Sequence, residues 1–114
     1  MAASKPALTV ILTPDAESEL WEIWRRNLDR YSYDHAESYE SFLKIGINRL
    51  ATAYEEGDEV ERFPELKSIT LKRSRRGDGY IVIYEADEED RSVIVFHIFH
   101  TKMDVQGRLE SERL

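Results

Sequence analysis

The stretch SVIVFHIFHTKMD (Ser92–Asp104) decides the fold, because it contains the most apolar strand of the chain and shows where that strand ends. Its first eight residues are mostly β-branched or aromatic, and residues of this kind favour strands. Since both faces of such a strand are apolar, we predict a central strand over 91–99. Thr101, Lys102 and Asp104 then mark its exit from the sheet.

Two histidines in this stretch suggest a metal pair or a catalytic dyad. Side chains alternate along a strand, so His97 and His100 are expected to point to opposite faces, whereas metal ligands must converge. We therefore predict a structural role for His97 and a place at the strand exit for His100. His35 is expected to be solvated at a helix start. The chain contains no familiar metal, phosphate-loop or dinucleotide motif, so we expect no metal site and no cofactor.

The N-terminal part predicts a strand followed by a helix. LTVIL (8–12) is β-branched and apolar, and TPDAESEL follows with Thr13 as cap and Pro14 at the first helical position. Apolar residues then recur every three or four positions. This spacing predicts a helix over roughly 14–31, with Arg25 and Arg26 directed outward.

A second amphipathic helix follows within a few residues. Asp34 and Glu37 resemble a capping box, an apolar stripe runs from Ala36 to Tyr54, and Gly57 ends the pattern. The short connection predicts an antiparallel helical hairpin.

The C-terminal half predicts three strands joined by hairpins. ERFPEL is expected to be a loop because Pro64 cannot donate a backbone hydrogen bond, and strands follow over 66–73, 79–86 and 91–99. The chain is therefore predicted to be one α+β domain over 1–114, of order β-α-α-β-β-β, with an antiparallel sheet packed on a helical hairpin. Residues 1–7 are expected to be a flexible N-terminus, and 106–114 a C-terminal tail.

One face of this sheet lacks a predicted cover. Tyr80, Val82 and Tyr84 alternate with two isoleucines, so both faces of this strand are apolar. Two helices can cover only one of them. Another element of the chain or a partner must cover the second face.

The charge is acidic overall and uneven along the chain. The net charge is −7, from 16 basic and 23 acidic residues, which disfavours binding to polyanions such as nucleic acids. One acid-free window is basic and contains Lys67, Lys72, Arg73, Arg75 and Arg76. These cations either guard a strand edge against aggregation or clamp a phosphate or carboxylate. The chain contains no cysteine and no apolar run long enough to span a membrane, so we expect a cytoplasmic protein.

A metal-free acid–base site is a further hypothesis. Tyr80, Tyr84 and His100, with basic neighbours, are the residue types that RNA cleavage requires. The alternative is that these tyrosines are core aromatics.

Four segments together resemble the ParE/RelE toxin superfamily of type II toxin–antitoxin systems, and the ParE branch most. They are LTVILTPDAESELWEIW, SFLKIGINRLATAYEEG with RFPEL, LKSITLKRSRRGDGYIVIYEAD and SVIVFHIFHTKMD. The resemblance covers residues 8–105 and places His100 and Asp104 at the family's strand exit. Family members often have Arg where this chain has Ile81. The missing cation weakens the case for phosphate-directed chemistry.

The resemblance implies a toxin without a catalytic site, which binds a protein target and is neutralised by a cognate antitoxin encoded nearby. DNA gyrase is the target it implies. The alternatives are a RelE-like, ribosome-dependent mRNA endoribonuclease using Arg73, Arg75, Tyr84 and His100, or a non-toxic binding module. The residues expected to bind the target or antitoxin are Lys72, Arg73, Arg75, Arg76, Tyr80, Val82, Tyr84, His100, Lys102 and Asp104.

Overall fold

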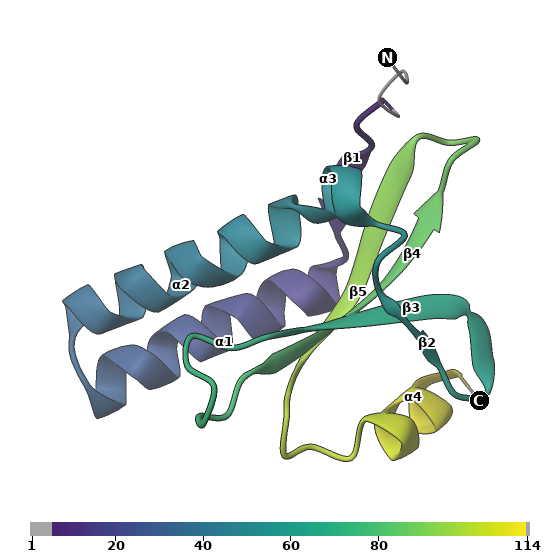
Figure 1. Ribbon diagram of the computed structural model, residues 1–114. Helices are drawn as coiled ribbons and strands as arrows, with labels where there is room; N and C mark the ends of the chain where they lie inside the picture. Colours follow the sequence, from purple (N-terminus) through teal and green to yellow (C-terminus); the bar gives the residue numbers. More distant parts are fainter. Residues whose placement is uncertain (1–5, 114) are drawn as a thin grey trace.

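The computed structural model describes residues 6–113, so the predicted flexible N-terminus lies mostly outside the described residues (Figure 1). The elements along the chain are β1 (Thr9–Leu12), α1 (Pro14–Arg30), α2 (Tyr33–Asn48), α3 (Leu50–Ala53), β2 (Asp58–Val60), β3 (Phe63–Leu71), β4 (Tyr80–Asp87), β5 (Ser92–His100) and α4 (Val105–Arg113).

The predicted α+β class is confirmed, with a sheet of order β1-β5-β4-β3-β2. β3, β4 and β5 form the expected antiparallel meander, and β5 lies inside the sheet between β1 and β4. β1 pairs with β5 in parallel, so the sheet is mixed where we predicted an antiparallel one. The α1–α2 hairpin lies along one face, and α4 lies on the other (Figure 1).

The start of α1 is confirmed residue by residue. Thr13 is the N-cap, its hydroxyl accepts a hydrogen bond from the Ala16 N–H at 3.2 Å, and Pro14 follows. The same hydroxyl donates to the Phe96 carbonyl of β5 at 3.1 Å. One side chain therefore both begins the helix and ties it to the sheet.

The start of α2 differs from the predicted capping box. Ser32 is the N-cap and accepts from the His35 N–H at 3.1 Å, so Asp34 lies inside the first turn. Glu37 instead accepts a hydrogen bond from the Trp24 indole at 2.7 Å, which joins the two helices. The same i to i+3 capping pattern therefore occurs two residues earlier, from Ser32 to His35, because Ser caps as well as Asp does. The helix also ends sooner than predicted, at Asn48, before the short α3.

The predicted loop ERFPEL is wrong, because β3 begins at Phe63 and β2 pairs with it. The pairing jumps from Val60↔Phe63 to Glu59↔Lys67, so Pro64 falls in the irregular part of the ladder. A proline is tolerated there because no pairing N–H is required.

β3 also ends earlier than predicted. Its ladder with β4 stops at Leu71↔Tyr80, and the chain leaves the sheet from Lys72 to Gly79. Four of the five basic residues of the acid-free window therefore lie in this β3–β4 loop, and all four are exposed. The strand-edge interpretation applies only to Lys67.

The second face of the sheet is covered by the chain itself. Residues predicted as a C-terminal tail form α4, and Leu109 of this helix is 2% exposed. A separate cluster forms beneath it from Val60, Leu66, Ile83, Phe99 and Leu109. The two-sided apolar pattern of β4 is thereby explained without a partner. Among the described residues, no helix has the length and apolar character needed to cross a membrane.

A bulge in β5 determines which side chains face the helical hairpin. Ile83 pairs with His97 and Tyr84 pairs with Val95, so Phe96 is an extra residue. The alternation of faces shifts at this point. Val95 lies in the core beneath the hairpin, and Ile98 returns to that core three residues later.

Candidate functional site: a cationic and aromatic cleft

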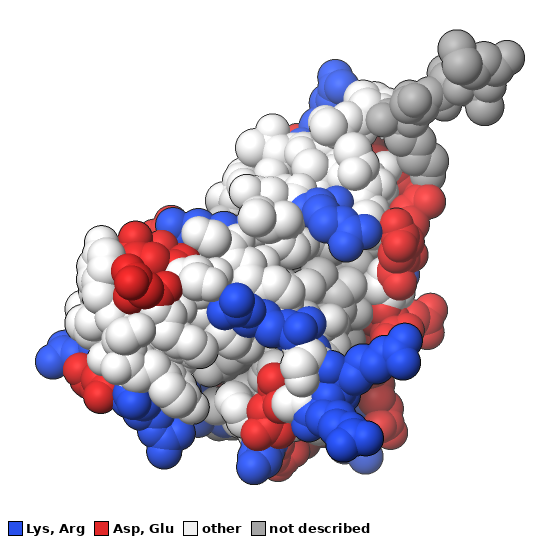
Figure 2. Space-filling view, turned by 60° about the vertical axis from the view of Figure 1, so that its left-hand side comes forward, with Lys and Arg blue, Asp and Glu red and all other residues white. Residues whose placement is uncertain are grey.

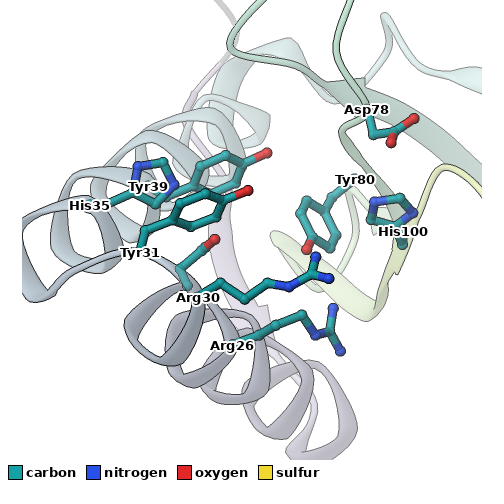
Figure 3. A pocket seen from close by; sticks show the side chains of 9 residues that line it. Arg26, Arg30, Tyr31, His35, Tyr39, Asp78, Tyr80 and His100 are labelled. Carbon is teal, nitrogen blue, oxygen red and sulfur yellow. The ribbon is translucent and has the colours of Figure 1, made fainter.

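A cleft of about 500 Å³ opens where the tip of the helical hairpin meets the sheet (Figure 3). α1, α2, the β3–β4 loop, β4 and β5 all contribute side chains to it. The lining residues are Arg26, Asn27, Arg30, Tyr31, His35, Tyr39, Asp78, Tyr80 and His100. The name "cationic cleft" refers to this set below.

Two arginines of α1 supply the positive charge. Arg26 and Arg30 are four residues apart, so they lie on the same face of the helix. Figure 3 shows both guanidinium groups directed toward the side of the cleft formed by Tyr80 and His100. Among the side chains that the structure describes, no carboxylate lies within ion-pair distance of either arginine. Like charges at this spacing cost a few tenths of a kcal/mol, roughly 0.2–0.5.

Tyr80 and His100 form the sheet side of the cleft. They are cross-strand neighbours in β4 and β5, and their rings meet edge to face at 5.3 Å. Burial raises the pKa of the Tyr80 hydroxyl above its ordinary value of 10.0, while the charge and hydrogen bond of Arg26 offset part of the rise. Tyr80 therefore stays a neutral phenol at neutral pH and accepts from Arg26, which leaves its own proton free to donate.

The hydrogen bond of His100 determines which ring nitrogen is free. Its Nδ1 lies 3.1 Å from the backbone N–H of Lys102 and accepts from it. In a neutral imidazole one nitrogen accepts and the other carries the proton. The neutral ring is therefore held with its proton on Nε2, so its remaining nitrogen is a donor.

Aromatic rings continue along α2. His35 lies between Tyr31, at 4.4 Å between ring centres, and Tyr39, at 6.1 Å. Arg73 of the β3–β4 loop lies over the Tyr39 ring at 5.6 Å. Burial raises the pKa of Tyr39, nearby Tyr80 adds to the rise, and Arg73 opposes it.

Four other predicted binding residues lie in the β3–β4 loop or pair with it. Lys72, Arg75 and Arg76 are exposed in the β3–β4 loop, and Lys102 pairs with Asp78 of that loop at 3.4 Å. Figure 2 shows separate basic and acidic groups around a largely uncharged area of the face in view. The loop cations form a local basic patch on a molecule with a net charge of −7.

Three residues of the predicted set have structural roles instead. Val82 and Tyr84 are fully buried, and the Tyr84 hydroxyl donates to the Tyr54 carbonyl at 2.7 Å. Asp104 accepts from the Gly107 N–H at 3.1 Å, which caps the start of α4. The first two cannot touch a partner in this conformation.

His97 is a buried member of an ion-pair cluster away from the cleft. Its Nδ1 lies 3.1 Å from Glu19 of α1, its Nε2 contacts Glu112 of α4, and its ring stacks on Phe99. Burial lowers the pKa of His97, but the hydrogen bond that its ring donates to Glu19 and the negative charges of Glu19 and Glu112 outweigh it and raise the pKa above 6.5. The predicted structural role fits this geometry, and the two histidines do not converge. Among the described residues, no group of three or more His, Asp or Glu could hold a metal ion.

The sequence interpretation missed the helical half of the cleft. Arg26 was assigned to the outer face of α1, and His35 to solvent, although His35 is only partly exposed. Two signals were present: arginines at positions 26 and 30, and aromatic rings at 31, 35 and 39. The two arginines have the four-residue spacing that aligns side chains on a helix, as do His35 and Tyr39 of α2, whereas Tyr31 is the C-cap residue of α1.

One comparison with known proteins identifies a family for this chain. The sequence profile described as "ParE toxin of type II toxin-antitoxin system, parDE" matches residues 10–105. Among curated proteins, no sequence matches the chain.

Solved structures share the fold at low sequence identity. A chain of the chromosomal ParDE toxin–antitoxin system from P. aeruginosa superposes with a TM-score of 0.70 at 12% identity, over 86% of this chain and 100% of that chain. A mutant of the E. coli toxin RelE in the free state gives 0.57 at 19% identity, over 95% and 98%. A chain of the Mycobacterium tuberculosis complex RelBE2 gives 0.54 at 21% identity, over 82% and 98%. Since the profile matches most of the chain, the protein belongs to the ParE toxin family and is a toxin of a type II toxin–antitoxin system with the ParE/RelE fold.

Proposed function

We propose that this toxin acts by binding a protein target and carries no catalytic site of its own. DNA gyrase is the target that the family resemblance implies, and a cognate antitoxin neutralises the toxin. The family assignment supports the antitoxin partner directly, since toxins of this type are paired with one.

The hydrogen bond at His100 is the observation that carries the proposal. A general base must offer a free lone pair to the proton that it removes. In the neutral ring, the lone pair of Nδ1 is taken by the Lys102 N–H. Tyr84, a second acid–base candidate from the sequence, is fully buried and donates to a backbone carbonyl. Tyr80, the third candidate, keeps its proton at neutral pH because burial raises its pKa. These contacts support a surface of hydrogen-bond donors for recognition.

The surface proposed for the target or antitoxin joins the cationic cleft to the β3–β4 loop. It keeps Lys72, Arg73, Arg75, Arg76, Tyr80, His100 and Lys102 from the sequence prediction and adds Arg26 and Arg30. Arg73 connects the two parts through its contact with Tyr39.

Supercoiling by purified gyrase tests the proposed target. The wild-type toxin is expected to inhibit supercoiling at a concentration near that of the enzyme, and premixing with the antitoxin is expected to restore it. Normal supercoiling at a large excess of a toxin that arrests growth would refute gyrase as the target.

Ribosome-dependent mRNA cleavage is a second candidate, favoured by the arginines and donors gathered around His100. Induction of the toxin followed by mapping of transcript ends distinguishes the two. Intact transcripts during growth arrest would exclude mRNA cleavage. Cleavage at defined codons would instead refute the proposal that the toxin acts by binding a protein target. Normal growth on induction would identify the chain as a non-toxic binding module.

A further inference from the structure

The two arginines of the cationic cleft have no counter-ion in the described structure. Arg26 and Arg30 lie on one helix face and are directed into one cleft, although like charges at this spacing repel. Arg62, by contrast, pairs with Glu110 at 2.8 Å. An anionic group entering the cleft would relieve the repulsion.

Neutral donors surround the position that such an anion would take. Tyr80 lines the cleft with Arg26, and its neutral phenol O–H can donate because burial keeps it protonated. His100 has its Nδ1 occupied and presents Nε2–H in the neutral ring. Charge-assisted hydrogen bonds from several donors bind a carboxylate or phosphate strongly.

Asp78 distinguishes between these two anions. This carboxylate lines the same cleft and is only partly neutralised, by an exposed contact with Lys102 at 3.4 Å. It repels a doubly charged phosphate more than a singly charged carboxylate, and it can accept from a peptide N–H. The net charge of −7 opposes a polyanion as well.

We propose that the cationic cleft binds a side-chain carboxylate of an acidic segment in a protein partner, between Arg26 and Arg30, with the partner's backbone N–H donating to Asp78. The inference rests on the proposed function, in which the toxin acts through protein partners, and it names the chemistry that those partners present.

Peptide binding by the purified toxin tests the inference without gyrase. The probe is a fluorescein-labelled eight-residue peptide of alternating Glu and Leu, and the matched probe replaces each Glu by Gln. Anisotropy is measured at low salt for the wild type, for the double variant R26Q/R30Q, and for Arg25→Gln. Arg25 is the control because it lies on the same helix, is exposed, and stacks on Trp21 outside the cleft.

The Glu peptide is expected to bind wild type and Arg25→Gln equally, and to bind R26Q/R30Q at least tenfold more weakly. The Gln peptide is expected to bind the wild type at least tenfold more weakly than the Glu peptide. Equal binding of the two peptides, or unchanged affinity of R26Q/R30Q, would overturn the inference. Tighter binding of octauridylate RNA or of adenosine monophosphate would also overturn it. Circular dichroism melting checks folding, and Arg30→Gln alone is the substitute if the double variant melts early.

The source of the acidic segment follows from growth assays on the same variant. Loss of growth arrest in R26Q/R30Q places the segment in the target, whereas arrest that the antitoxin no longer relieves places it in the antitoxin. Arrest and rescue both at the wild-type level would overturn the inference. A toxin that binds the Glu peptide but leaves gyrase active would refute the gyrase proposal and leave this inference standing.

Discussion

The substitution Tyr84→Phe separates a structural from a catalytic role for this residue. Tyr84 is fully buried, and its hydroxyl donates to the Tyr54 carbonyl at 2.7 Å. Burial raises its pKa, which keeps the hydroxyl protonated as a donor. Phenylalanine retains the ring and its packing but removes the hydroxyl that donates to the Tyr54 carbonyl, directly after α3.

The expected cost is a loss of stability with little change in toxicity. A net intramolecular hydrogen bond contributes about 0.5–1.5 kcal/mol. We expect the free energy of unfolding to fall by about this amount, which lowers Tm by about 4–8 °C per kcal/mol in a domain near this size.

Urea unfolding followed by tryptophan fluorescence measures this change, and growth arrest on induction measures function. Tyr33→Phe is the control, since Tyr33 is 59% exposed and is expected to melt like the wild type. An unchanged stability of Tyr84→Phe together with lost toxicity would refute the reasoning, because the hydroxyl would then act in function and not in folding.

Three further predictions concern stability. Since the pKa of folded His97 is raised above 6.5, its charged form stabilises the fold fully below pH 6.5, and this contribution is lost as the pH rises through the folded pKa. The Tm advantage of the wild type over His97→Gln is therefore expected to be larger at pH 5.5 than at pH 8.5, and an equal advantage at both would contradict the ion-pair cluster. Leu109→Ala is expected to lower the free energy of unfolding in urea by about 2–4 kcal/mol, because Leu109 is the buried contact of α4. The variant is also expected to bind a hydrophobic dye at the second face of the sheet. An unchanged urea midpoint would mean that α4 does not cover the sheet. Thr13→Ala is expected to lower the free energy of unfolding by about 1 kcal/mol because the cap is lost, whereas Thr13→Ser is expected to keep most of the capping stability. Equal melting temperatures of the two variants would argue against capping.

Local patterns were sufficient for most elements of the fold. The Thr13–Pro14 start of α1 was predicted because a cap depends on neighbours within three residues. The strands β4 and β5 were predicted to within one residue, since both are long apolar runs between polar turns. The helix α4 was missed because it is mostly polar and, among the side chains that the structure describes in it, Leu109 alone is buried.

The cleft could be predicted only in part. Tyr80 and His100 were nominated from strand ends and a resemblance, and the structure brings them together as cross-strand neighbours. Arg26 and Arg30 could not be placed beside them from periodicity, because both lie at the margin of the apolar stripe of α1. Which margin faces the sheet depends on how the hairpin packs.

Spacing within short windows of the sequence was enough to predict the α+β class, the helical hairpin and the antiparallel meander, and the four segments over residues 8–105 together indicated the family. Packing between distant segments was needed to show that α4 covers the second face and that Tyr84 is a core residue. It also decided which faces His97 and His100 occupy relative to the helices, since the extra residue Phe96 shifts the alternation of β5. The physical reason is the same in each case: burial and convergence of side chains depend on pairing register and packing between segments far apart in the chain, which local spacing does not encode.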